Sequence, residues 1–117
     1  MITTNDLTTQ AIEWALQGLE RRSEVIANNV ANAEVPNFQA QRVEFEGQLQ
    51  AALGSGRVDT TADAAVVGSG EAPGANGNNV LMEDELVGML ETNLMKKAMI
   101  EAFNYKAGLL RLAVGSR

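Results

Sequence analysis

The chain has 117 residues, of which 45% are hydrophobic and only 4% aromatic, and its formal net charge is −6. This length allows one modest domain or one long helical hairpin, and the acidic balance excludes the basic surface that nucleic-acid binding needs. With neither cysteine nor histidine, the chain lacks disulfides and the commonest catalytic and transition-metal ligands, so we predict no cofactor and no metal site.

Residues 5–32 are predicted to form a first long helix. Its apolar residues recur at alternating steps of four and three, which is typical of a helix that pairs with another helix. The stripe consists of Ile12, Leu16, Leu19, Ser23, Ile26, Val30 and Ala33. Pro36 predicts that the helix ends near Asn32, and Asn37 suits a turn that needs a positive φ.

The next segment, residues 34–53, is predicted to be a turn, an extended piece and a short helix. Val43 and Phe45 alternate with acidic residues, as in a strand, whereas the spacing after Phe45 is helical. Residues 54–79 are rich in glycine and contain only three large apolar residues. Such a segment buries too little apolar surface to offset its ordering entropy, so we expect it to be flexible.

Residues 80–117 are predicted to form a second long helix, with Asn78 and Asn79 as candidate N-caps. Acidic residues 83–85 lie in its first turns, where the helix dipole favours anions. Its apolar stripe consists of Leu86, Met89, Leu90, Ile100, Phe103, Ala107, Leu110 and Val114. We therefore predict an all-α fold in which the terminal helices, residues 1–33 and 80–117, pair as an antiparallel coiled-coil-like hairpin.

Catalytic and ligand-binding motifs are weak throughout. The carboxylates Glu44 and Glu46 alternate with apolar residues, and the cluster at 83–85 suits a helix start, so neither indicates acid–base catalysis. Glycines 68, 70 and 74 are one residue off the dinucleotide fingerprint and follow no strand pattern. We predict that the chain is not an enzyme.

Four small or polar residues near the end of the first helix, Ala27, Asn28, Ala31 and Asn32, form two i,i+4 pairs. Small residues allow a neighbouring helix to come close, and asparagine amides bond across the gap. The other interpretation is a plain helix end at which asparagine acts as a stop signal. The residues alone leave both interpretations open.

The residues around this helix end resemble a known signature. Residues 23–38, SEVIANNVANAEVPNF, are similar to the N-terminal motif of flagellar rod and hook proteins, and residues 39–45, QAQRVEF, resemble its FlgB branch. Toward the other end, residues 77–80, 85–89 and 109–117, together with Asn93, also resemble FlgB. The chain departs from the family pattern at Asn37, where glycine is usual, at Val35, where threonine is usual, and at Lys97, where an aromatic residue is common.

The resemblance implies a structural subunit of the bacterial flagellar basal-body proximal rod, which assembles helically with other rod proteins. It also implies contacts with the rod–membrane-ring junction and with the flagellar type III export apparatus. Residues 1–20 lack a basic residue and a long apolar run, so we expect export without a cleavable signal and no membrane insertion.

Subunit contacts are expected on both terminal helices and the turn between residues 32 and 38. The candidate interaction residues are Leu16, Leu19, Ile26, Ala27, Asn28, Asn29, Val30, Ala31, Asn32, Pro36, Phe38, Leu86, Met89, Asn93, Ile100, Phe103 and Leu110. Two alternatives remain: another rod subunit of the same group, of the FlgC type, and a small helical chaperone or adaptor of a secretion system.

Overall fold

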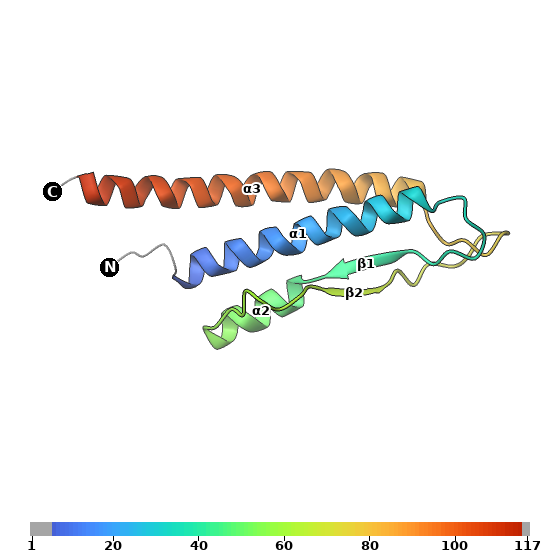
Figure 1. Ribbon diagram of the computed structural model, residues 1–117, viewed down its shortest axis with the longest axis horizontal. Helices are drawn as coiled ribbons and strands as arrows, with labels where there is room; N and C mark the ends of the chain where they lie inside the picture. Colours follow the sequence, from blue (N-terminus) through green and yellow to red (C-terminus); the bar gives the residue numbers. More distant parts are fainter. Residues whose placement is uncertain (1–5, 116–117) are drawn as a thin grey trace.

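The computed structural model describes residues 6–115, which form an elongated molecule of 67 × 26 × 17 Å (Figure 1). Two long helices, α1 (Leu7–Ala31) and α3 (Met82–Gly115), lie side by side and run antiparallel. An arm made of β1 (Gln41–Glu44), α2 (Glu46–Ser55) and β2 (Ala65–Gly68) packs on α1. No helix within residues 6–115 is long and apolar enough to cross a membrane.

Helix α1 begins and ends close to the predicted residues. At its start the Asp6 carboxylate accepts a hydrogen bond from the Thr9 N–H at 2.9 Å, which is an N-cap. The chain leaves the helix before Pro36 through a turn in which Asn37 adopts a φ of 63°. The prediction that Asn37 tolerates positive φ is therefore confirmed.

The extended piece and the short helix were also predicted, but the structure is not all-α. Strand β1 pairs antiparallel with β2, and Val43 lies opposite Val66. Strand β2 was not predicted, because only Val66 and Val67 are large apolar residues in that part of the chain. Pairing with β1 satisfies their backbone groups, which an isolated four-residue strand could not do.

The segment 54–79, predicted to be flexible, is divided in the structure. In its first half the Trp14 indole N–H donates to the Ala62 carbonyl at 2.8 Å, and Val58 and Val66 pack against the core. Residues 70–76 are exposed and form the distal loop. The first half is therefore part of the folded arm. It is held there by contacts with residues of α1 that are far away in the sequence.

The hydrophobic core lies between α1 and the arm rather than between the two long helices. It contains Trp14, Ala15, Leu19, Val25, Val43 and Phe45, all less than 5% exposed. The rings of Trp14 and Phe45 meet edge to face with centroids 6.0 Å apart. Among the described residues of α3, by contrast, only Thr92 is buried.

The start of α3 differs from the prediction. The helix begins at Met82, and Asn78 and Asn79 are not its caps but are buried and bound to other segments. The acidic residues 83–85 do lie in the first turn, as predicted.

Candidate interaction surface

The inward face of α3 is mixed in polarity, and on it Met99 packs against the core. Thr92, on this face, is 1% exposed, and its hydroxyl donates to the Gly88 carbonyl at 2.7 Å. Ile26 of α1 lies beside Gly88, where a β-carbon would be in ordinary van der Waals contact with the Ile26 Cδ1 at 3.4 Å. Farther along, Lys96 pairs with Glu20 at 3.0 Å. The inward face of α3 thus combines polar and charged side chains with partly buried apolar ones such as Met99.

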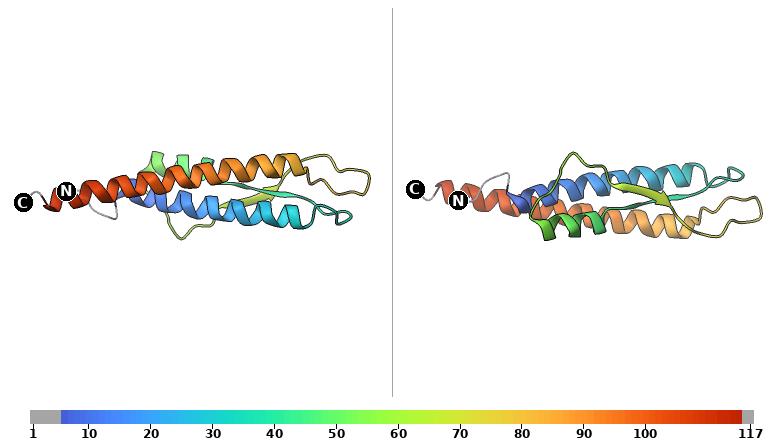
Figure 2. Two further views of the ribbon diagram at one scale, coloured as in Figure 1. Left: turned by 90° about the horizontal axis from the view of Figure 1, so that it is seen from above. Right: turned by 90° about the horizontal axis from the view of Figure 1, so that it is seen from below.

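The opposite face of α3 is apolar and uncovered. Five large side chains recur along it at helical spacing and are 54–71% exposed; they are Val87, Leu90, Leu94, Tyr105 and Leu112. Figure 2 shows that neither α1 nor the arm passes over this outer side of α3. A water-facing helix normally carries its large apolar residues inward, and these five residues depart from that pattern. We call these five residues the outer stripe.

The predicted apolar stripe of the second helix is divided in the structure: Met89, Ala107 and Leu110 are partly buried, whereas the other members are exposed. Leu86 and Leu90 are each 62% exposed, and Ile100 is 49% exposed. The periodicity predicted a helix that lies along another helix, and α3 does lie along α1, but several members of the predicted stripe are exposed to solvent. Two lysines, Lys96 and Lys97, interrupt the predicted stripe. Lys96 does so because it forms an ion pair with Glu20 of α1.

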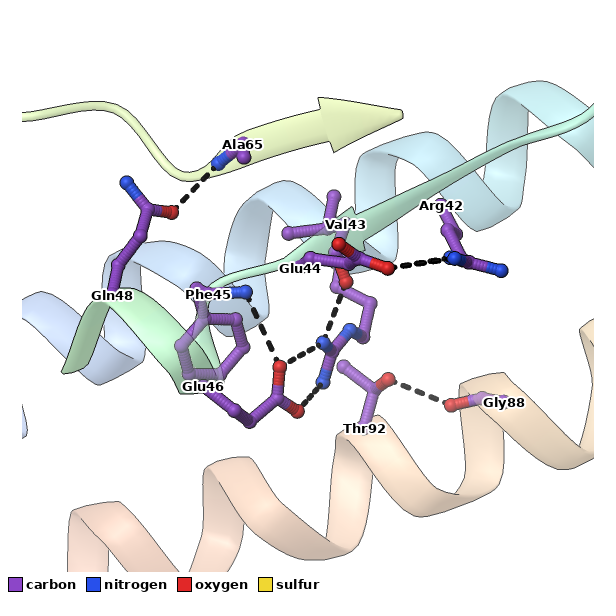
Figure 3. A network of polar contacts seen from close by, with 10 residues as sticks. Arg42, Val43, Glu44, Phe45, Glu46, Gln48, Ala65, Gly88 and Thr92 are labelled. Atoms are coloured by element: carbon purple, nitrogen blue, oxygen red, sulfur yellow. Dashed lines mark hydrogen bonds and ion pairs between the residues drawn. The ribbon is translucent and has the colours of Figure 1, made fainter. Parts of the chain in front are cut away.

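Arg22 joins α1 to the arm. Its guanidinium forms a bidentate pair with Glu46, with the shorter contact at 2.7 Å, and also donates to the Val43 carbonyl. It lies 4.7 Å from the centre of the Phe45 ring, which is within cation–π range. Figure 3 shows the Glu46 carboxylate turned toward this group and toward the Phe45 N–H. Hydrogen bonding to Arg22 lowers the pKa of the Glu46 carboxyl.

Asn29 is a buried residue whose side chain forms hydrogen bonds with two other elements. It is fully buried, and its amide accepts from the Gln41 N–H and donates to the Gln41 carbonyl at 2.7 Å. The same amide donates to the Glu85 carboxylate at 3.1 Å, so one side chain joins α1, β1 and α3. Burial raises the pKa of the Glu85 carboxyl despite this hydrogen bond.

Asn78 and Asn79 hold the distal loops together. The Asn78 amide donates to the carbonyls of Asn32 and Val35, which satisfies the end of α1. The Asn79 side chain accepts from the Ala40 N–H at 2.6 Å. The pattern of polar residues in the sequence did not reveal these roles, because each depends on segments about 40 residues away.

The residues predicted for subunit contacts fall into two groups. Exposed ones lie at the end of α1, in the following turn and along α3; they are Ala27, Asn28, Val30, Ala31, Pro36, Leu86, Asn93, Ile100 and Phe103. Leu19, Ile26 and Asn29 are buried within the subunit, and Leu16, Asn32, Phe38, Met89 and Leu110 are partly buried. Of the two interpretations of the Asn28 region, the structure shows Asn32 bonding to Asn28 within the helix end. Whether the exposed members contact neighbours stays a prediction.

A cleft of about 390 Å³ lies between α3 and the arm. Its lining includes Arg22, Val25 and Ile26 of α1, together with Glu71 and Glu91. No group of three or more acidic side chains within residues 6–115 is arranged to hold a metal ion.

Known proteins similar to this chain share one description. A family model described as "Flagella basal body rod protein" matches residues 13–39. The flagellar basal body rod protein FlgB of Bacillus subtilis is 30% identical over 89% of this chain and 90% of its own length. FlgB of Aeromonas hydrophila is 29% identical over 90% of this chain and 91% of its own. FlgB of Yersinia ruckeri is 42% identical over a shorter stretch of 45 residues.

Proposed function

The chain belongs to the FlgB family of flagellar basal body rod proteins, and from this premise we propose that it builds the proximal rod by burying the outer stripe of α3 against neighbouring subunits. As a structural rod protein it associates with other rod proteins in the basal body. The single observation that supports the proposed contact is the outer stripe itself, whose five large side chains are 54–71% exposed in the subunit.

The energetics favour such burial. Fully burying one large apolar side chain contributes roughly 1.5–3 kcal/mol, and the outer stripe has five that are more than half exposed. Exposed apolar patches of this kind usually mark a protein–protein contact. Helix α3 would then gain from its neighbours the apolar burial that α1 does not provide. We also propose that α1 and α3 remain paired in the rod as a coiled-coil-like hairpin.

Two further partners belong to the proposal, the rod–membrane-ring junction and the flagellar type III export apparatus. Both come from the family resemblance. The exposed residues near the end of α1, such as Ala27 and Ala31, are small enough to let a neighbouring helix approach closely. Export also suits a subunit whose longest helix has little apolar burial of its own, because such a helix unfolds at low cost.

Leu90→Asp tests the proposal, with Ala51→Asp on α2 as the matched control. Both residues are exposed in the subunit, so each variant should keep the wild-type helical circular dichroism. In cells that lack the wild-type protein, Leu90→Asp should abolish motility and be absent from isolated basal bodies, whereas Ala51→Asp should support both. Normal incorporation of Leu90→Asp would contradict the proposed contact. Recovery of the wild-type protein only in soluble complexes, and never in basal bodies, would favour the chaperone alternative.

A further inference from the structure

The outer stripe of α3 repeats itself along the helix. Val87, Leu90 and Leu94 are followed, each 18 residues later, by Tyr105, Gly108 and Leu112. Eighteen residues are five turns at about 3.6 residues per turn, so the two triplets point in the same direction. Gly108 leaves a gap in the second triplet, because a β-carbon there would meet no other atom within 4 Å. A leucine from another helix has room at that position.

The charges of α3 change sign over the same interval. Residues 82–91 contain four acidic residues and no basic one, whereas residues 96–111 contain four basic residues and one acidic. Lys96 and Lys106 of the basic half face α1, where they pair with Glu20 and Asp6. Arg111 and, in the acidic half, Glu91 are exposed. The two halves are therefore complementary in charge as well as similar in apolar shape.

We propose that α3 packs against α3 of a second copy of this chain, parallel to it and shifted by 18 residues, or about 27 Å at ~1.5 Å per residue. This inference rests on the proposed rod function and specifies its contact. Leu90 of one copy then packs at Gly108 of the next, and Leu94 packs at Leu112. The helical positions also place Glu91 and Arg111 of adjacent copies on the same flank of the contact.

A contact of this kind propagates. The two halves of α3 are different surfaces, so each copy still offers one free half after it has bound a neighbour. Such a head-to-tail contact produces an open helical assembly, whereas an antiparallel α3 pair would close as a two-fold dimer and stop. Glu83 of one copy would lie level with Glu101 of the next. This is the one like-charged pair along the stripe, and Glu83 lies in the first turn of α3.

Cysteine cross-linking distinguishes these arrangements, because the chain has no cysteine of its own. Basal bodies should be isolated from cells that express Leu94→Cys/Leu112→Cys and then oxidised. The double variant should give trimers and larger multimers, and each single variant should stay monomeric. Dimers that never extend would indicate an antiparallel pair and overturn the proposal. Cross-links of Leu94→Cys alone, or cross-links to a different rod protein, would also overturn it.

A charge exchange provides the second test, which does not depend on disulfide geometry. Glu91→Arg and Arg111→Glu should each reduce the amount of the protein in basal bodies by several-fold, and the double exchange should restore it. Failure of the double exchange to restore incorporation would contradict the pairing. Absence of the wild-type protein from basal bodies would contradict the proposed function itself. If the wild-type protein is present but neither test gives the expected result, only the proposed α3 contact is contradicted.

Discussion

The ring of Phe45 lies directly over Gly18, so that a β-carbon at residue 18 would be only 2.8 Å from the ring. Glycine in the middle of a helix costs about 1 kcal/mol relative to alanine, and α1 carries that cost at this one position. Because residue 18 has no side chain, the Phe45 ring can be buried between Trp14 and Arg22, where it is only 2% exposed. The arm is seated on α1 at this contact.

Gly18→Ala should therefore destabilise the protein, although alanine favours helix formation. The added methyl group has to displace the ring of a buried Phe45, and overpacking of this kind costs typically ~1–3 kcal/mol. Gly47→Ala on α2 is the matched control, because a β-carbon there meets nothing within 4 Å. Thermal unfolding followed by circular dichroism should show a lower Tm for the first variant and an equal or higher Tm for the second. A raised Tm for Gly18→Ala would mean that the arm does not stay on α1 in solution.

Asn29→Ala should be strongly destabilising, whereas Asn28→Ala should be nearly neutral. Asn29 is fully buried and satisfies both backbone groups of Gln41, whereas Asn28 is exposed. Each buried polar group left without a partner costs about 1–3 kcal/mol. Urea unfolding of the two variants would measure the difference. Equal stability of the two variants would show that water replaces the Asn29 amide.

Glu85 and Asp6 should give opposite pH dependences. Burial raises the pKa of Glu85, so its protonated form favours folding; this contribution is gained as the pH falls from 7 through that pKa toward 4.5. Hydrogen bonding to Lys106 lowers the pKa of Asp6 from 3.8 to about 2, so its contribution is present above pH 3.8 and is lost as the pH falls toward 2.

Glu85→Gln should accordingly raise the Tm at pH 7 and flatten the Tm profile between pH 7 and 4.5. Asp6→Asn should lower the Tm at pH 7 and remove part of the decrease between pH 4 and 2. Thermal unfolding across this pH range checks both. A lower Tm of Glu85→Gln at pH 7 would show that the charged carboxylate is needed for its bond to Asn29.

The two halves of segment 54–79 should respond differently to an insertion. Four residues of Gly-Ser-Gly-Ser placed between Ala72 and Pro73 should be tolerated, because both residues are exposed and a longer loop costs little entropy. The same insertion between Thr61 and Ala62 should disturb the bond from Trp14 to Ala62. Limited proteolysis and motility assays should show near-wild-type behaviour for the first variant and increased cleavage near residue 62 for the second. Equal tolerance would mean that Trp14 does not hold the arm.

The amino-acid sequence by itself determined the local features of this protein. The four-and-three spacing of residues 12–33 predicts α1, and Pro36 predicts where it ends. The change of period at Phe45 predicts a strand followed by a short helix, and Asn37 occupies the positive-φ turn. The motif at residues 23–38 was sufficient to indicate the rod family. All of these are set by interactions within a few residues of each other.

Only the tertiary structure decided which surfaces meet. Val66 lies opposite Val43, and Asn78 reaches the end of α1, through pairings across more than 20 residues that no local period encodes. Periodicity predicted one apolar stripe on α3, but it did not show which residues of that stripe face α1. In the structure Thr92 is buried and Gly88 lies beside Ile26, so the side of α3 that carries them faces α1. The outer stripe is left exposed for that reason.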